Sequence, residues 1–227
     1  MTRYPKAIIY DLDGVITDTA EFHFVAWQKL AAELGISIDR HFNEQLKGIS
    51  RMDSLDLILE LDSSEKHYSD DEKVQLATQK NEYYLGLIEA VSPAHILPGI
   101  EVLLKANREA GVKIALGSAS KNAPALLEKL GLVSYFDFIV DASQVKKGKP
   151  DPETFTTAAD TLGIDYKDCI GIEDSAAGIE SINKAGMFSV GVGDKNHLAN
   201  ADFLVADTSE LVFEEIITEY QKASSES

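Results

Sequence analysis

Residues 7–18, Ala-Ile-Ile-Tyr-Asp-Leu-Asp-Gly-Val-Ile-Thr-Asp, decide how this chain folds and where its chemistry lies. The apolar, strand-forming run Ala7–Tyr10 leads directly into Asp11 and Asp13. Side chains two apart along a strand point the same way, so both carboxylates can face one site beyond the strand. Gly14 allows the chain to turn at once, close to that site. An Asp-x-Asp-Gly motif by itself also fits two solvated acids in a β-turn, and the rest of the chain must decide between these interpretations.

The composition excludes several classes of protein. The 227 residues, 44% hydrophobic and 26% charged, suit a soluble globular protein with a sizeable core. A net charge of −17 argues against nucleic acid as a partner, although local cations or a metal can still attract an anionic substrate. The single cysteine, Cys169, rules out an intramolecular disulfide and suits a reducing compartment. Because neither a signal-peptide pattern nor an apolar run of transmembrane length is found, we expect a cytoplasmic protein with no membrane partner.

Short apolar runs alternate with amphipathic segments along most of the chain. This alternation predicts an α/β fold, a doubly wound and mostly parallel sheet with helices on both faces. The predicted strands are Ala7–Tyr10, Lys113–Ser118, Phe138–Val140, Cys169–Glu173, Phe188–Val192 and Phe203–Val205. The helices between and after them are expected near 99–110, 122–131, 151–163, 175–186 and 208–221. The last few residues are expected to fray.

One region breaks this alternation, because residues 17–91 carry helix signals and no strand signal. Asp18 can cap a first helix, and Gly35 can end it. Further helices are expected near 52–61 and 70–90. We therefore predict a helical cap domain inserted directly after the first strand of an α/β core. The predicted boundaries are 1–16 and 92–227 for the core domain and 17–91 for the cap domain.

Polar residues also follow three later strands. Ser118 opens a loop, Ser-Ala-Ser-Lys-Asn (118–122), whose hydroxyl and N–H groups can bind phosphate oxygens or simply cap a helix. Lys149 precedes a predicted helix. If the other polar groups were not present, it would be interpreted as a solvated charge. Glu173 and Asp174 end a strand at the carboxyl edge of the sheet, where acids suit a hard cation. Four such groups in sequence order argue against a purely structural interpretation.

This order of residues resembles the haloacid dehalogenase superfamily of phosphotransferases, and the match covers nearly the whole chain. The resemblance implies that Asp11 is the nucleophile that becomes an aspartyl phosphate and that Asp13 is the general acid and base. It also implies that Ser118 and Lys149 stabilise the transferring oxygens. Attack by a carboxylate on a phosphate brings like charges together, which Mg²⁺ offsets. The implied Mg²⁺ ligands are Asp11, the backbone carbonyl of Asp13, Asp174 and, directly or in the second coordination shell, Glu173.

Residues of the helical insert narrow this resemblance to the sugar phosphomutases of the superfamily. His23 and Trp27 lie four apart and hence on one helix face. Gly48 permits close backbone approach to a ligand, and Arg51 carries a planar fork suited to phosphate. Each of three residues also has an alternative to substrate binding that stays open. The alternative is a structural role for His23, a surface ion pair for Arg51 and a place on the helix surface for Lys80. The segments that carry the resemblance are 47–51, 79–81, 91–94 and 118–122. The implied substrate-binding residues are His23, Trp27, Lys47, Gly48, Ile49, Ser50, Arg51, Lys80, Ser120, Lys121 and Asn122.

A mutase must keep its aspartyl phosphate intact until the other end of a bisphosphorylated sugar arrives, so it needs a second phosphate site. We expect Arg51, Ser120, Lys121 and Asn122 to form that site, and closure of the cap to expel water. The resemblance implies interconversion of β-D-glucose 1-phosphate and D-glucose 6-phosphate through β-D-glucose 1,6-bisphosphate. Glucose 1,6-bisphosphate or another phosphodonor would prime the enzyme.

Two other functions stay open at this stage. One is a Mg²⁺-dependent phosphatase for small molecules such as a sugar phosphate or phosphoglycolate. The other is a non-catalytic sensor of phosphometabolites, although a sensor has no need of a nucleophile. For all three functions we expect a monomer whose partners are small sugar phosphates or related molecules.

Overall fold

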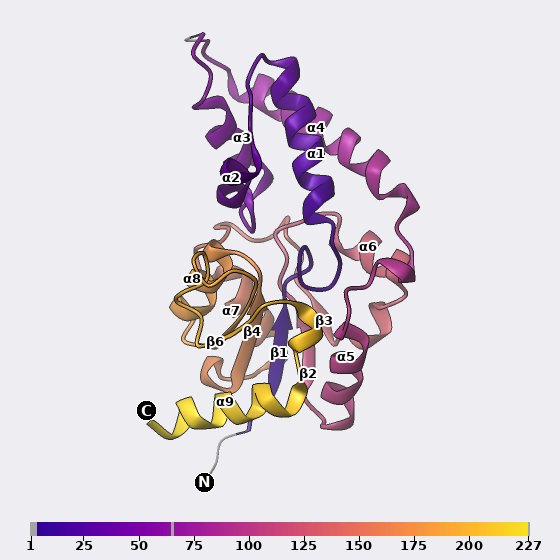
Figure 1. The fold of residues 1–227 in the computed structure, drawn as a ribbon, viewed down its shortest axis with the longest axis vertical. Helices are drawn as coiled ribbons and strands as arrows, with labels where there is room; N and C mark the ends of the chain where they lie inside the picture. The colour runs from indigo at the N-terminus through magenta and orange to yellow at the C-terminus, as the bar shows by residue number, and fades with distance from the viewer. Residues whose placement is uncertain (1–3, 65, 227) are drawn as a thin grey trace.

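The computed structural model describes residues 4–64 and 66–226. Its centre is a six-stranded parallel sheet with the strand order β3-β2-β1-β4-β5-β6 (Figure 1). Strand β1 therefore lies between β2 and β4, with Ala7 in register with Lys113 on one side and Cys169 on the other. The strands are β1 (Ala7–Tyr10), β2 (Lys113–Leu116), β3 (Phe138–Ile139), β4 (Cys169–Glu173), β5 (Phe188–Val192) and β6 (Phe203–Val205).

Alternate residues of β1 join different apolar cores on the two faces of the sheet. Ile8 and Tyr10 pack with residues of helices α5 (Ile100–Glu109), α6 (Ala123–Leu130) and α9 (Phe213–Glu226). Ala7 and Ile9 pack with residues of α7 (Glu153–Leu162) and α8 (Ala176–Lys184). All four strand residues are fully buried. Helices thus cover both faces, which confirms the predicted doubly wound α/β fold.

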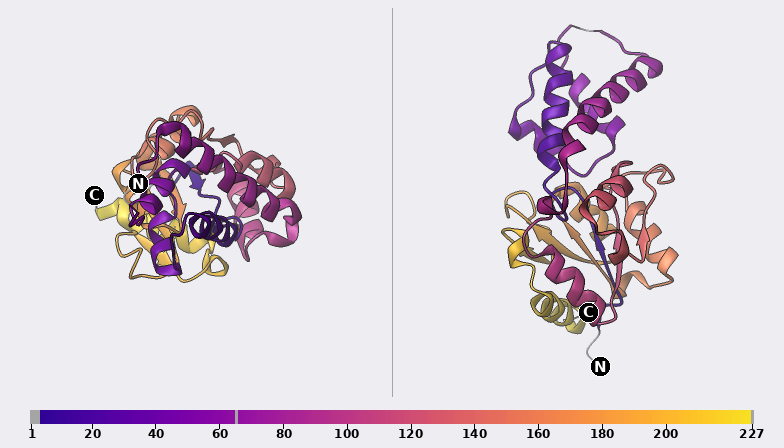
Figure 2. Two further views of the ribbon diagram at one scale, coloured as in Figure 1. Left: turned by 90° about the horizontal axis from the view of Figure 1, so that it is seen from above. Right: turned by 90° about the vertical axis from the view of Figure 1, so that its right-hand side faces the viewer.

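A group of helices between β1 and α5 stands over the carboxyl end of the sheet, where Figures 1 and 2 show it as a separate lobe. It consists of α1 (Ala20–Glu33), α2 (Arg40–Asn43), α3 (Arg51–Leu59) and α4 (Asp70–Leu87). These helices enclose an apolar cluster of their own, which includes Phe24, Trp27, Leu30, Leu55 and Ile58. This separate cluster supports the proposed cap domain of residues 17–91. Short 3₁₀ helices lie at Glu44–Leu46, Ile88–Ala90, Pro93–His95, Val133–Tyr135, Tyr166–Asp168 and Thr208–Glu210.

Three boundaries differ from the prediction near the site. Strand β2 ends at Leu116 instead of Ser118, so Ser118 lies in the loop. Strand β3 ends one residue earlier than expected, at Ile139. The residue that caps α1 is Thr19 instead of Asp18, and its side chain does not bond to the helix. The Thr19 hydroxyl donates to Asp13 instead, because a carboxylate is a stronger acceptor than the alternatives nearby.

The C-terminal helix also differs from the prediction. Helix α9 begins at Phe213, after a 3₁₀ turn, and continues to Glu226, where a frayed tail was expected. It continues because its apolar face still packs on the sheet: Tyr220 is buried and meets Phe188 edge-on, with ring centroids 5.7 Å apart. Cys169 is buried, and burial raises the pKa of its thiol to about 12. Among the described residues, no helix is both long and apolar enough to span a membrane.

Candidate active site

The polar residues that follow the central strands meet at one edge of the sheet. Asp11 follows β1 and Ser118 follows β2, while Asp174 follows β4. Because β1 lies between β2 and β4, parallel pairing brings these three strand ends together. All three side chains line a single cavity of about 940 Å³, which the helical lobe covers from the other side.

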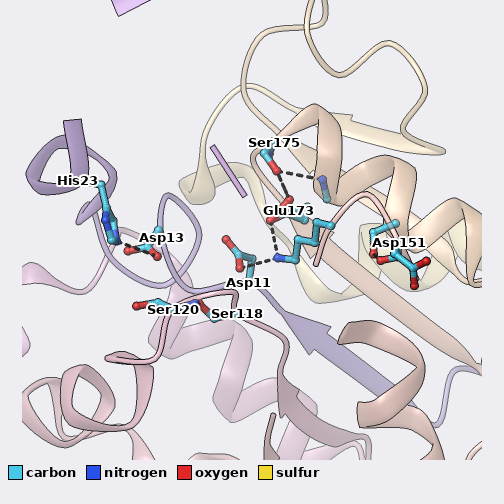
Figure 3. A network of polar contacts seen from close by, with 11 residues as sticks. Asp11, Asp13, His23, Ser118, Ser120, Asp151, Glu173 and Ser175 are labelled. Atoms are coloured by element: carbon cyan, nitrogen blue, oxygen red, sulfur yellow. Dashed lines mark hydrogen bonds and ion pairs between the residues drawn. The ribbon is translucent and has the colours of Figure 1, made fainter. Parts of the chain in front are cut away.

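Lys149 connects the nucleophile candidate to the acid at the end of β4. Its Nζ lies 2.8 Å from Asp11 Oδ1 and 3.2 Å from Glu173 Oε1 (Figure 3). All three side chains are buried. Burial favours a lower pKa for Lys149, but the charges of Asp11 and Glu173 outweigh it and raise the pKa. Lys149 is therefore a permanent cation beside Asp11, suited to stabilise negative charge on a transferring phosphoryl group.

Three carboxylates form a cluster whose chemistry fits a hard divalent cation. One oxygen each from Asp11, Glu173 and Asp174 lies within 4.8 Å of the others, in the part of the chain that the structure describes. Burial and the neighbouring Asp11 raise the pKa of Asp174 to about 7, and burial likewise raises the pKa of Glu173. Burial is the larger cause of both shifts; the neighbouring carboxylates add to it, and the nearby lysines partly offset it. An oxygen-only donor set of three carboxylates suits Mg²⁺ or Ca²⁺.

Two residues that the sequence analysis missed fix the position of Glu173. The Ser175 hydroxyl donates to Glu173 Oε2 at 2.6 Å and accepts from the Gly178 backbone N–H at 3.0 Å. A Cβ atom at Gly178 would lie 1.4 Å from Glu173 Oε2, so only glycine leaves room for the carboxylate. The sequence signal for Ser175 was its place before a helix, where serine commonly acts as the N-cap.

On the other side of the cavity, Asp13 contacts residues of the helical lobe. His23 Nε2 lies 3.6 Å from Asp13 Oδ2, and Lys80 Nζ lies 2.7 Å from His23 Nδ1. When the Lys80 amine is charged it can only donate, so Nδ1 then accepts and the imidazole carries its proton on Nε2, toward Asp13. Burial and the charge of Lys80 lower the pKa of His23. Thr19, another residue that the sequence analysis missed, completes this set by donating to Asp13.

The electrostatics of this group keep Asp13 ionised. Burial raises the pKa of Asp13, but His23 and the hydrogen bond from Thr19 outweigh it, so the pKa lies below its usual value. Lys80 is 2% exposed, and burial together with the nearby charge of Arg51 lowers its pKa to about 7. Lys80 is thus a buried residue of the cavity wall, and its placement on the helix surface is excluded. Asp13 is ready to accept a proton from a hydroxyl group.

The cavity wall contains nearly all of the substrate-binding residues expected from the resemblance. These are His23, Trp27, Lys47, Gly48, Ile49, Ser50, Arg51, Lys80, Ser120 and Lys121. Asn122 is not among the lining residues, although its neighbours Ser120 and Lys121 are, and its side-chain N–H₂ donates to Asn81 Oδ1 at 3.0 Å. The alternative of a surface ion pair for Arg51 is wrong: no carboxylate in the described ranges pairs with it, and its Nη2 donates to Asn81 at 2.8 Å. Asn81 is the fourth residue, after Ser175, Gly178 and Thr19, that the sequence analysis did not place in the site.

Gly48 brings the helical lobe into contact with the core. Its φ of +74° favours glycine, and a Cβ atom there would lie 2.2 Å from Ser175 Oγ. The adjacent Lys47 Nζ lies 3.9 Å from Asp174 Oδ2. The loop that carries these two residues therefore closes the cavity directly above the acidic cluster.

The sequence and the structure were compared with known proteins. A family model described as haloacid dehalogenase-like hydrolase matches residues 5–186. The chain is 46% identical to a β-phosphoglucomutase of Bacillus subtilis over 217 residues, 96% of each protein. It is 34% identical to a fructose-1-phosphate phosphatase of Escherichia coli, over 84% of this chain and 97% of that protein.

A solved structure with the same architecture is a β-phosphoglucomutase from Clostridium difficile. It superposes with a TM-score of 0.94 and 50% sequence identity, covering 97% of this chain and 99% of that one. The likeness thus includes both the sheet and the helical lobe. By its matching family model and these full-length relatives, the chain belongs to the haloacid dehalogenase-like hydrolase family.

Proposed function

We propose that this protein is a phosphomutase that interconverts β-D-glucose 1-phosphate and D-glucose 6-phosphate. The observation that carries the proposal is the likeness to β-phosphoglucomutases over nearly the whole chain, at 46% and 50% identity. That likeness includes the helical lobe, which supplies half of the cavity wall and therefore much of the substrate selectivity. Such a reaction belongs to a cytoplasmic enzyme of carbohydrate metabolism, and we expect it to act as a monomer.

In the proposed cycle, the resting enzyme carries a phosphoryl group on Asp11, placed there by glucose 1,6-bisphosphate or another phosphodonor. When β-D-glucose 1-phosphate binds, Asp13 removes the proton from the C6 hydroxyl group. The C6 oxygen then attacks phosphorus, and the bond from phosphorus to the Asp11 oxygen breaks. The products of this half-reaction are β-D-glucose 1,6-bisphosphate, free Asp11 and protonated Asp13.

The second half-reaction begins after the bisphosphate turns end for end. Asp11 attacks the phosphorus at C1, the bond from phosphorus to the C1 oxygen breaks, and Asp13 returns its proton to that oxygen. Glucose 6-phosphate leaves, and Asp11 is phosphorylated again. Throughout, Lys149 and Ser118 are proposed to bind the transferring oxygens, and His23 is proposed to hold the orientation of Asp13; the contacts of Lys149 with Asp11 and of His23 with Asp13 support these roles.

Asp11, Glu173 and Asp174 are the residues that would hold Mg²⁺, with the Asp13 backbone carbonyl as a further ligand. Bound there, Mg²⁺ would supply positive charge that offsets the repulsion between the Asp11 carboxylate and the phosphate. The argument that these residues suit Mg²⁺ rests on their own chemistry. They offer three carboxylate groups, whose negative charge the neighbouring lysines offset only in part.

Arg51, Ser120, Lys121 and Asn122 are proposed to bind the phosphate group that is not being transferred. Arg51, Ser120 and Lys121 line the same cavity as Asp11, and Arg51 has no carboxylate partner within the described residues. An unpaired guanidinium group in a chain with a net charge of −17 suits a dianionic ligand. A second anion site of this kind is what a mutase requires and a simple phosphatase does not.

A product assay tests the proposal. The enzyme is supplied with Mg²⁺, a trace of glucose 1,6-bisphosphate and either the β- or the α-anomer of glucose 1-phosphate. We expect glucose 6-phosphate from the β-anomer alone. Free phosphate as the main product from either anomer would instead favour a phosphatase, the function carried by the Escherichia coli relative.

A further inference from the structure

Asn81 joins the helical lobe to the α/β core at a point that the proposed mechanism does not use. Its side-chain oxygen accepts one hydrogen bond from Arg51 Nη2 at 2.8 Å and another from Asn122 Nδ2 at 3.0 Å. Arg51 begins helix α3 and Asn81 lies on α4, whereas Asn122 precedes α6 of the core. A single oxygen atom thus connects two helices of the lobe with the phosphate-binding loop 118–122.

We propose that Asn81 is a positioning residue for the second phosphate site, which rests on the proposed function above. Arg51 lines the cavity, whereas Asn81 is not among the lining residues and contacts Arg51 through its Nη2. A guanidinium group has five N–H donors, so the bond to Asn81 leaves the others for a phosphate group in the cavity. Asn81 therefore sets the direction of Arg51 without taking the place of the ligand.

The acceptor at this position must be neutral for the site to bind a dianion. An amide oxygen orients the guanidinium group and leaves its full charge available. A carboxylate would form an ion pair with Arg51 and would repel the phosphate. The chain contains 38 acidic residues, yet the partner of Arg51 is an amide. An amide at position 81 therefore indicates that Arg51 is held in place as a cation for a ligand and is not neutralised in an internal ion pair.

The second bond of Asn81 fixes the core half of the same site. Asn122 also donates its backbone N–H to Ser120 Oγ at 3.2 Å, so its position is coupled to that of the loop. Ser120 and its neighbour Lys121 both line the cavity. Because the Asn81–Asn122 bond crosses between lobe and core, it holds Arg51 close to the loop in the arrangement that this structure shows. The two halves of the phosphate site are then aligned before the ligand arrives.

Helix α4 offers a matched control for the test. Gln79 carries the same amide group two residues earlier, and it bonds to Glu33 at 2.8 Å and Tyr83 at 2.7 Å, both within the lobe. Asn81→Ala removes both bonds of the proposed device, and Asn81→Asp keeps the shape but adds charge. Gln79→Ala removes an amide of the same helix without touching the site.

Two reactions of each purified variant separate the positioning role from a merely structural one. For β-glucose 1-phosphate, we expect Asn81→Ala to raise KM about tenfold to thirtyfold, as the loss of two hydrogen bonds implies, and Asn81→Asp to raise it further. The hydrolysis of acetyl phosphate, which has no second phosphate group, should change less than about twofold. Gln79→Ala should leave both values near those of the wild type.

Three results would overturn the inference: a KM for Asn81→Ala no higher than that of Gln79→Ala, equal losses in both reactions, or wild-type behaviour of Asn81→Asp. The near-isosteric Asn81→Asp keeps the test decisive if the alanine variant does not fold, as thermal unfolding would reveal. If the wild type releases inorganic phosphate from the sugar, the proposed function fails by itself. Calorimetric titration with glucose 6-phosphate, which needs no turnover, then still compares the three variants and decides the role of Asn81.

Discussion

Replacing Lys80 with methionine is expected to stabilise the fold while it damages the site. In the unfolded chain this amine titrates near 10.5, but in the folded protein its pKa is about 7, because of burial and the nearby charge of Arg51. At about 1.4 kcal/mol per pH unit, that gap corresponds to a folding penalty of about 4–5 kcal/mol. Methionine has a stem of similar length and no charge, so it removes the penalty.

Several favourable contacts of Lys80 are lost in the same substitution. The ammonium group lies 4.7 Å from the ring centroid of Trp27 and 5.0 Å from that of Tyr84, contacts worth together about 1–2 kcal/mol. The hydrogen bond to His23 contributes about 1 kcal/mol more. We therefore expect Lys80→Met to be more stable than the wild type by about 2 kcal/mol at pH 6.5.

The pH dependence gives the sign of the effect. Because the folded-state pKa lies below the unfolded one, the penalty is fully present below about pH 7 and disappears as the pH rises toward 10.5. Asp13, His23 and Arg51 face the same amine and are retained in the variant. The stability of Lys80→Met relative to the wild type should accordingly fall by about 3 kcal/mol between pH 6.5 and pH 9.5, which turns the advantage of about 2 kcal/mol into a disadvantage of about 1 kcal/mol.

Urea unfolding followed by the fluorescence of Trp27, the single tryptophan, measures this difference within the lobe. Lys73→Met is the control: it lies on the same helix, and its ion pair with Asp56 raises its pKa, so its removal should change the free energy of unfolding little at either pH. A Lys80→Met variant that is less stable at pH 6.5, or an advantage that does not change with pH, would refute the reasoning.

Three further substitutions test other parts of the site. Asp11→Asn should abolish turnover and leave the fold intact, and retained activity would remove the covalent mechanism. Gly48→Ala should lower kcat/KM at least about tenfold, because the added Cβ meets Ser175 Oγ and prevents full closure of the lobe; unchanged kinetics would mean that closure does not need this contact. Ser175→Ala should weaken Mg²⁺ binding, measured by calorimetry, about tenfold through the loss of the bond to Glu173, and equal affinity would contradict that role.

The sheet and the acidic half of the site could be predicted from sequence for one physical reason. Parallel strands such as Ala7–Tyr10 are buried on both faces and read as continuous apolar runs, and their carboxyl ends meet at one edge. Asp11 and Asp174 follow such a run directly and Ser118 follows one after Gly117, so their proximity follows from topology. For these three residues, the order of the strands along the chain is enough to predict that they meet.

The half of the site that the helical lobe supplies was harder to predict. Helix α4 carries polar and charged residues over most of its length, so nothing in its sequence distinguishes the buried Lys80 from the less buried polar residues around it. The burial of Lys80 depends on how α4 packs against α1. Its contact with His23 on α1, for example, joins residues that are 57 positions apart in the sequence. The bonds of Asn81 depend in turn on how the lobe closes on the core. Tertiary packing, not local pattern, decides all of these contacts.

The central claim is that Asp11 passes its phosphoryl group to a sugar and not to water, and a single-turnover experiment tests it most directly. The enzyme is labelled on Asp11 with radioactive acetyl phosphate and Mg²⁺, and it is then mixed with excess β-glucose 1-phosphate or with buffer. Our account predicts that the sugar speeds the loss of label from the protein and that most of the label appears in glucose bisphosphate and glucose 6-phosphate. Release of the label as inorganic phosphate, at the same rate with and without the sugar, would contradict it.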